Sequence, residues 1–262
     1  MNKSSSIKGV PDFYSLEFLE KKNKYCLCIP VLNELGRINV QLEKMKKRGI
    51  DKIIDIAICD GCSTDGSTNS DMLKQYGVNT LLRLDKKIGQ SAQMRMGFWW
   101  ALERGYEGII SIDGNNKDSI EDIPKFIDKL EEGYDFIQGS RFLGKQENTP
   151  MYRFLAIRLI HAPIISITAG YKFTDTTNGF KGYSKKYLTD SRVQPFRDIF
   201  KTYEILDYLT ARAGKLKLKV CEIPVTRRYP SKKVYSTKLT FFRGNILLLK
   251  ILLSNFLGKY NP

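Results

Sequence analysis

Histidine is nearly absent from this 262-residue chain, which has only His161. A single histidine excludes His-rich metal sites and leaves little room for acid/base chemistry by imidazole. Cysteine is also scarce, and its five residues are an odd number that suits reduced thiols better than a disulfide framework. Neither G-x-G-x-x-G after a strand nor G-x-x-x-x-G-K-[ST] occurs, which argues against dinucleotide binding and P-loop ATP binding.

Long apolar runs are missing as well. The first apolar run begins at Tyr25 without a signal-peptide pattern before it, and no segment reaches the roughly 20 uninterrupted apolar residues of a transmembrane helix. With 42% hydrophobic residues the chain can nevertheless bury a full core. We therefore expect a cytoplasmic protein that is peripheral on the inner face of the membrane.

Negative charge is scarce in the second half of the chain. Residues 1–140 contain 20 Lys and Arg against 21 Asp and Glu, whereas residues 141–262 contain 23 against 7. The excess that gives a net charge of +15 therefore lies in the second half. Such asymmetry predicts an anionic partner there, which could be a phosphorylated substrate, an anionic membrane surface or nucleic acid.

The chain does contain a regular alternation of strand and helix patterns. The expected strands are 25–31, 53–59, 80–84, 108–112 and 136–139, and the expected helices are 35–47, 90–104 and 120–130. This order predicts an α/β fold with a mostly parallel, twisted sheet and helices on both faces. Right-handed crossovers then place the strand ends and their loops at one edge of the sheet.

Polar, acid-bearing loops follow three of these strands, at residues 30–34, 60–67 and 113–115. Asp113 comes directly after an apolar strand, and a carboxylate at such a position lies where ligands bind in α/β sheets. It can hold a divalent ion against a phosphate, while loop N–H groups suit a diphosphate. The alternative is an ordinary strand-to-helix turn in which Asp and Asn act as turn formers and caps.

A series of short motifs completes the pattern. They lie at residues 29–34, 60–67, 87–101, 113–115, 139–142, 175–180, 222–225 and 236–238. In this order and at these intervals, the motifs resemble those of inverting family 2 glycosyltransferases, most closely the dolichyl- and polyprenyl-phosphate sugar transferase branch. The resemblance covers roughly residues 24–262. It implies a GT-A fold and transfer of a sugar from a nucleoside diphosphate donor.

The resemblance also implies roles for individual residues. Asp113 and Asn115 occupy the D-x-D motif that chelates a divalent cation, Mg²⁺ or Mn²⁺, bridging the diphosphate. Arg141 is the candidate for neutralising phosphate charge, and with Asp113 and Asp175 it forms the expected catalytic set. The residues expected to bind substrate are Pro30, Glu34, Asp60, Lys87, Lys117, Arg228 and Lys238.

Two positions in and just after the D-x-D motif depart from the pattern of this branch. The second acid of D-x-D is Asn115, and Lys117 replaces the glutamine that often follows. An amide oxygen is a poorer ligand for a hard cation than a carboxylate, and a nearby ammonium competes with the metal. Metal dependence is therefore left open, with Lys117 as a direct phosphate contact that partly replaces the ion.

Asp175 is the candidate on the acceptor side. If the acceptor is a hydroxyl, an inverting transfer needs a general base, and a carboxylate can serve. If the acceptor is a lipid phosphate, the nucleophile is already anionic and the carboxylate positions other groups. A plain turn-capping role is the third possibility.

The last part of the chain is basic and then apolar. Residues 226–243 combine cations with aromatic side chains, a composition that suits single-stranded RNA or a membrane interface. Residues 246–257 are too short to span a bilayer and favour an amphipathic interfacial helix, with a helix packed on the core as the alternative. We therefore expect contact with an anionic membrane surface and no nucleic-acid partner.

The sequence thus predicts four segments. They are an N-terminal extension (1–23), a nucleotide-sugar-binding half (24–145), an acceptor half of the same domain (146–225), and a basic loop with an interfacial helix (226–262). The predicted partners are a nucleotide sugar and a polyprenyl phosphate or other lipid-linked acceptor, in surface polysaccharide or glycoconjugate synthesis. The alternatives are a glycan hydroxyl acceptor and a non-catalytic basic module that binds RNA or lipid.

Overall fold

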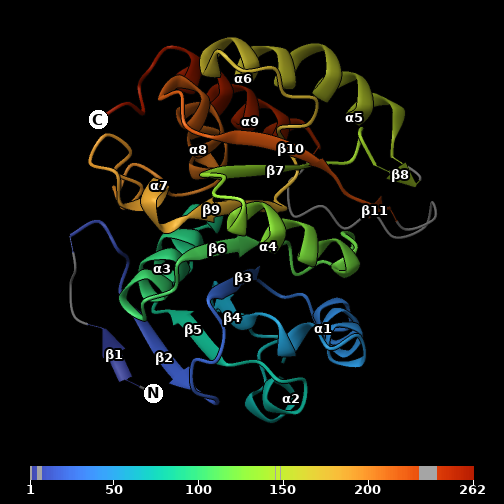
Figure 1. Ribbon diagram of the computed structural model, residues 1–262, viewed down its shortest axis with the longest axis vertical. Coiled ribbons are helices and arrows are strands. Elements are labelled where there is room, and N and C mark those ends of the chain that lie inside the picture. The colour runs from blue at the N-terminus through green and yellow to red at the C-terminus, as the bar shows by residue number, and fades with distance from the viewer. Residues whose placement is uncertain (1, 5–7, 145, 148, 230–240) are drawn as a thin grey trace.

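A nine-stranded sheet runs through the computed structural model, which describes residues 2–4, 8–144, 146–147, 149–229 and 241–262 (Figure 1). From one edge to the other the strands are β1 (Asn2–Ser4), β2 (Phe13–Glu17), β5 (Thr80–Leu84), β4 (Asp55–Asp60), β3 (Tyr25–Val31), β6 (Gly108–Ser111), β9 (Lys181–Ser184), β7 (Phe136–Ser140) and β10 (Val220–Pro224).

The predicted parallel core is confirmed, within a sheet that is mixed as a whole. Strands β5, β4, β3 and β6 are parallel neighbours, so their carboxyl ends meet at one edge. The antiparallel strand β9 lies between β6 and β7, with Lys181 opposite both Ser111 and Gln138. The loop that precedes β9 therefore reaches the same edge as the ends of β6 and β7. At the far edge, the N-terminal extension adds β2 and β1.

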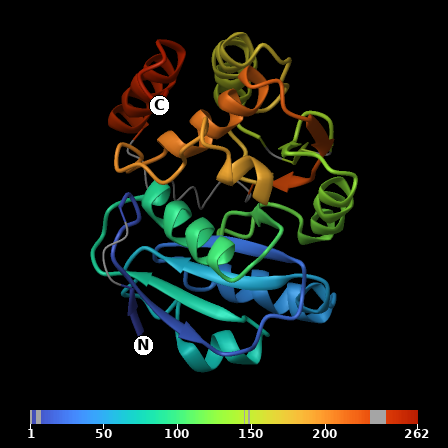
Figure 2. The same ribbon diagram turned by 60° about the vertical axis from the view of Figure 1, so that its left-hand side comes forward.

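Helices cover both faces of the sheet (Figures 1 and 2). On one face lie α1 (Arg37–Lys47), α2 (Ser70–Gln75) and α4 (Ile123–Glu131), with the short 3₁₀ turns Ile50–Lys52 and Ile120–Asp122. On the other lie α3 (Gln90–Glu103), α7 (Lys185–Thr189) and α8 (Glu204–Lys215). Strand β3 shows the two-residue period that produces these layers, since Leu27 and Ile29 join the first core and Cys26 and Cys28 the second.

Helix α3 lies unusually close to the sheet at Gly97. A Cβ atom at Gly97 would lie 2.5 Å from Sγ of Cys59 and 3.3 Å from Sγ of Cys28. Glycine is therefore required here by packing, which explains the small residue in the motif at 87–101. The thiols of Cys28 and Cys59 are both buried and free.

A long helix at one end of the molecule follows β7 and the short strand β8 (Gln146–Glu147) in the chain. It comprises α5 (Met151–Ala156), a π-helical segment (Ile157–His161) and α6 (Ala162–Ala169), and it packs against α8 and α9 (Phe241–Phe256). Nearby, the two-residue strands β8 and β11 (Arg227–Arg228) pair in parallel. By length and composition alone, the helix Met151–Ala169 could cross a membrane, and 17% of its most apolar stretch is buried.

Helix α9 has two different apolar faces. Ile251 and Leu252 are buried against the domain, and the amide of Asn255 donates a hydrogen bond to the Asp207 carbonyl. The other face exposes large apolar residues, namely Ile246, Leu249, Leu253 and Phe256, and Leu257 directly after the helix is exposed as well. The helix predicted at 246–257 is thus present and is packed on the core along one face only.

Candidate functional site

The loops after β3 and β4 are bonded to each other at the carboxyl edge of the sheet. The amide of Asn33 donates to Ser63 Oγ at 3.0 Å, and the amide of Thr64 donates to Asn33 Oδ1 at 2.8 Å. Asn33 has a φ of 51°, a left-handed conformation that asparagine tolerates better than most residues. The two loops therefore form one preorganised wall.

The predicted nucleoside-binding residues lie along this wall. Pro30 is near the end of β3, partly exposed, and Glu34 forms an ion pair with Arg37 at 2.7 Å. Asp60 is fully buried at the end of β4, where its carboxylate accepts hydrogen bonds from the Ser63 amide (2.8 Å) and the Thr68 hydroxyl (3.4 Å). In this structure Asp60 orders the loop, so direct contact with a nucleoside stays a prediction.

Asp113 follows β6 and lies among residues from three other segments. Gln90, at the start of α3, donates to Asp113 Oδ1 at 3.4 Å, and Nη2 of Arg227 lies 3.3 Å from Asp113 Oδ2. A Cβ atom at Gly179 would lie 2.7 Å from Asp113 Oδ1. The Asp-Thr-Thr-Asn-Gly-Phe turn therefore reaches the Asp113 carboxylate, which joins the predicted donor and acceptor motifs in one site.

The two positions that depart from the family pattern lie in the same turn. Nδ2 of Asn115 lies 3.4 Å from Asp113 Oδ2, while Oδ1 of Asn115 accepts the Lys117 amide at 3.2 Å. The Lys117 ammonium lies 5.5 Å from the centre of the Tyr229 ring. Burial, followed by the charge of Arg227, lowers the pKa of Lys117 from its ordinary value.

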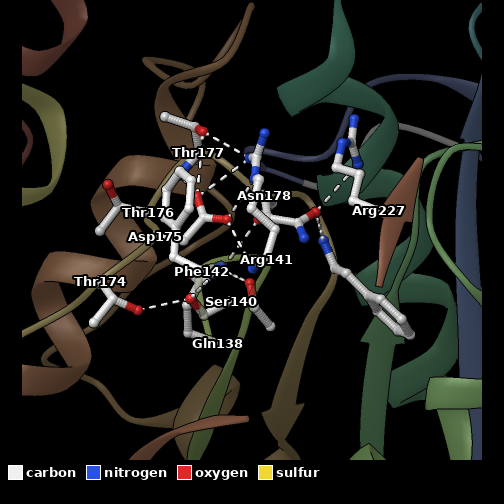
Figure 3. Close-up of polar contacts among 12 residues, drawn as sticks. Gln138, Ser140, Arg141, Phe142, Thr174, Asp175, Thr176, Thr177, Asn178 and Arg227 are labelled. Carbon is white, nitrogen blue, oxygen red and sulfur yellow. Dashed lines mark hydrogen bonds and ion pairs between the residues drawn. The ribbon is translucent and has the colours of Figure 1, made fainter. Parts of the chain in front are cut away.

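Arg141 and Asp175 form a buried ion pair (Figure 3). Nε of Arg141 donates to Asp175 Oδ2 at 2.6 Å, Nη2 donates to Oδ1 at 3.2 Å, and the Arg141 amide also donates to Oδ2 at 3.2 Å. Burial alone would raise the pKa of Asp175, but the Arg141 charge and these hydrogen bonds outweigh it and lower the pKa. The Asp175 carboxylate is therefore a fixed anion.

Tyr229 lies at the centre of a cationic cluster. Its hydroxyl accepts a hydrogen bond from Nη1 of Arg141 at 2.6 Å, and its ring lies within 5.8 Å of Lys117, Arg153 and Arg227. Burial opposes ionisation of this hydroxyl, but the surrounding guanidinium groups outweigh burial and lower its pKa. An anionic group bound beside Tyr229 would meet several positive charges at once.

The remaining predicted residues lie further out. Arg228 is exposed and lines a surface cavity of about 400 Å³ with Lys117, Lys44, Lys47 and Arg48. Lys87 is exposed in the connection between β5 and α3 and is not brought into the Asp113 cluster by any contact described in the structure. Lys238 lies outside the described residues.

Residues 26–191 match the family described as glycosyl transferase family 2. This chain belongs to glycosyl transferase family 2. The family assignment confirms the resemblance drawn from the motifs and makes the protein a glycosyltransferase.

Named relatives of this glycosyltransferase include two that act on lipid phosphates. It is 26% identical over 203 residues to the undecaprenyl-phosphate mannosyltransferase of Micrococcus luteus, covering 76% of this chain and 81% of that protein. It is 26% identical over 208 residues to the dolichol-phosphate mannosyltransferase of Pyrococcus furiosus, covering 78% of this chain and 56% of that protein.

Solved structures resemble the glycosyltransferase in fold. Glucosyl-3-phosphoglycerate synthase from Mycobacterium tuberculosis, in complex with Mn²⁺, uridine diphosphate and glucosyl-3-phosphoglycerate, superposes with a TM-score of 0.62. The identity is 12%, and the match covers 90% of this chain and 79% of that chain. The likeness confirms the predicted GT-A fold.

Three residues that the sequence did not single out prove central to the site of this glycosyltransferase. Both carboxylate oxygens of Glu222 accept the Thr174 amide, at 2.9 and 2.8 Å, and one also accepts the Asp175 amide at 3.2 Å. Arg227 and Tyr229 lie within a stretch predicted only as generally basic and aromatic. Glu222 lies in the middle of β10, within the motif at 222–225, and a carboxylate there can accept the N–H groups of a neighbouring loop.

Proposed function

We propose that this glycosyltransferase moves a sugar from a nucleoside diphosphate sugar to a polyprenyl phosphate at the cytoplasmic face of a membrane, in surface polysaccharide or glycoconjugate synthesis. The observation that carries the proposal is the burial and ion pairing of the Asp175 carboxylate. Its carboxylate is buried, bonded to Arg141 and shifted to a lower pKa. A base for a hydroxyl acceptor works best with a pKa near the working pH, and Asp175 has the opposite shift.

A phosphate acceptor removes the need for a base. One of its oxygens attacks the anomeric carbon of the sugar while the bond from that carbon to the diphosphate oxygen breaks. The electron pair of the broken bond leaves with the nucleoside diphosphate, and no proton is transferred. In this reaction Asp175 holds Arg141 in place, and the fixed cations around Tyr229 attract the acceptor phosphate.

The donor side of the proposal rests on Asp113 and the wall formed by the loops after β3 and β4. Pro30, Glu34 and Asp60 are the residues proposed to bind or order the nucleoside. Asp113 and its neighbours would then lie beside the diphosphate, where negative charge develops during transfer. The relatives named for undecaprenyl phosphate and dolichol phosphate support a lipid phosphate as the acceptor.

Two apolar helix faces support a site at a membrane surface. The exposed residues of α9 are joined by those of the helix Met151–Ala169, namely Met151, Tyr152, Leu155, Leu159, Ile160 and Ile167. Both helices lie at the end of the molecule remote from β1 and β2, and α6 packs against α9 (Figures 1 and 2). We propose a helix pair that lies in the interface, because each helix also has a face packed on the domain.

The test is transfer of radiolabelled sugar from a panel of nucleotide sugars to polyprenyl phosphate in detergent or vesicles. We expect label to enter the organic phase with the wild type, and Asp113→Asn to lower turnover by at least about 100-fold while remaining folded. Label that stays in water on a glycan would favour a hydroxyl acceptor. Failure to bind any nucleotide sugar by calorimetry would favour a non-catalytic basic module.

A further inference from the structure

A guanidinium group lies at the position where the D-x-D motif would hold a metal ion. Nη2 of Arg227 is 3.3 Å from Asp113 Oδ2, and Nη1 bonds to the Asp118 carboxylate. Nη1 also donates to Asn178 Oδ1 at 3.2 Å (Figure 3). The Arg227 side chain is 7% exposed. The carboxylate expected to bind a cation is thus already paired with a cation that belongs to the protein.

The backbone fixes Arg227 in this position. The segment that carries it runs alongside the turn after Asp113, with Ser119 donating to the Thr226 carbonyl at 2.9 Å and Arg228 donating to the Lys117 carbonyl at 2.8 Å. Asp118 and Arg227 also form an antiparallel bridge. Because the guanidinium is held by both its backbone and its ion pairs, its charge is preorganised.

The other residues of the motif do not fit a divalent cation. Asn115 directs its amide nitrogen toward Asp113 and uses its amide oxygen for the Lys117 N–H. An Mg²⁺ or Mn²⁺ ion on Asp113 would also lie beside the Arg227 charge, which a partly buried site screens poorly.

The charges of the four ionisable side chains around Asp113 sum to zero without a metal ion. Asp113 and Asp118 contribute two negative charges, and Arg227 and Lys117 contribute two positive charges. Two carboxylates with one divalent ion would give the same sum. Arg227 and Lys117 come from segments 110 residues apart, and the structure places both beside the Tyr229 ring.

We infer that Arg227, with Lys117, takes the place of the divalent cation, so that this enzyme binds a nucleoside diphosphate and stabilises its departure without a metal. The inference rests on the proposed function. The bond that breaks is the one between the anomeric carbon and the diphosphate oxygen, and the added negative charge on the diphosphate faces the Arg227 and Lys117 cations. The predicted Mg²⁺ or Mn²⁺ is then no part of the function proposed for this chain.

Calorimetry of the full chain with UDP and with GDP tests the inference directly. We expect the Kd of whichever nucleotide binds to differ by less than threefold between EDTA and excess Mn²⁺. A Kd at least tenfold lower in Mn²⁺ would overturn the inference while leaving the proposed function standing. Absence of binding under both conditions, with nucleotide sugars also failing to bind, would overturn the proposed function itself.

A double variant that removes one positive and one negative charge gives a second test. Arg227→Gln together with Asp118→Asn removes the buried pair without leaving one partner charged and alone. We expect this double variant to bind the nucleotide at least tenfold more weakly in EDTA, whereas Arg104→Gln, which removes a surface guanidinium, binds as the wild type does. Adding Asn115→Asp and Lys117→Gln should restore binding only in Mn²⁺. Wild-type affinity of the folded double variant in EDTA would contradict the role of Arg227.

Discussion

Tyr229 and Arg141 are 88 residues apart in the chain, and the tyrosine hydroxyl accepts a 2.6 Å hydrogen bond from Nη1 of the arginine. The other nitrogens of the same guanidinium bond to Asp175 and Thr177. A buried guanidinium in this position has nearly all its donors used, so its orientation is fixed. Tyr229 therefore connects the basic segment after β10 to the Arg141–Asp175 ion pair.

Tyr229→Phe should weaken transfer without unfolding the protein. The change leaves Nη1 of Arg141 buried without the Tyr229 hydroxyl as its acceptor, which costs about 1–3 kcal/mol. We expect kcat/KM for polyprenyl phosphate to fall at least about tenfold. Tyr134→Phe, in the turn between α4 and β7, is the control. Unchanged kcat/KM in Tyr229→Phe would show that the hydroxyl has no part in the site.

Gly179→Ala should lower the turnover of the enzyme while leaving its thermal stability nearly unchanged. The added Cβ would lie 2.7 Å from Asp113 Oδ1, which is the end of a side chain that can move aside. We expect the thermal midpoint to change little, because no backbone atom blocks the methyl group, and turnover to fall at least about tenfold, because Asp113 is displaced. Gly133→Ala, where a Cβ meets nothing within 4 Å but φ is 78°, provides the converse control of strain without crowding. Full activity in Gly179→Ala would argue against a role for the Asp113 position.

Burial of Lys181 should make the free energy of unfolding change with pH above about pH 8. Its ammonium is buried among Gln138, Thr176 and Thr210, and burial lowers its pKa to about 8. Between this value and the ordinary pKa near 10.4 the unfolded chain binds a proton that the folded chain does not, so the free energy of unfolding rises with pH by up to about 1.4 kcal/mol per unit. Below pH 8 both states are charged and the slope vanishes.

The measurement compares urea denaturation of the wild type and Lys181→Met from pH 7 to pH 10. The wild type should gain stability relative to the variant above pH 8, with exposed Lys185→Met as the control for removing a lysine. A difference between wild type and Lys181→Met that is constant over this range would contradict the lowered pKa.

Membrane attachment should depend on the exposed face of α9 and leave the packed face untouched. We expect Leu249→Ser, Leu253→Ser and Phe256→Ser together to release the enzyme from anionic vesicles while nucleotide binding persists, since each buried Leu or Phe side chain contributes roughly 1.5–3 kcal/mol. Leu252→Ser should instead lower the thermal midpoint, because Leu252 is 2% exposed. High salt should weaken the wild-type attachment without abolishing it. A wild type that never floats with vesicles would remove this support for a lipid acceptor.

Local patterns predicted the elements well and the contacts between distant side chains poorly. The apolar run ending at Asp113 identified β6 and its loop because alternating strands and helices allow few arrangements. The pairs Arg141–Asp175 and Arg227–Asp113 depend on β9 lying antiparallel between β6 and β7. A four-residue strand with two small side chains has no periodicity strong enough to fix its direction or its neighbours. Asp60 shows a further limit of prediction from motifs. It was expected to bind the nucleoside, but in the structure its side chain is fully buried and orders its own loop.

Strand β9 has a consequence for how substrates enter and products leave. It is hydrogen-bonded to β6 on one side and to β7 on the other, so the strands that precede Asp113 and Arg141 belong to one continuous ladder. A hinge motion that opened the donor side away from the acceptor side would have to break that ladder. The rate of product release should therefore depend on movements of the loops and helices outside the sheet. The distance between Asp113 and Arg141 should stay nearly constant through the catalytic cycle.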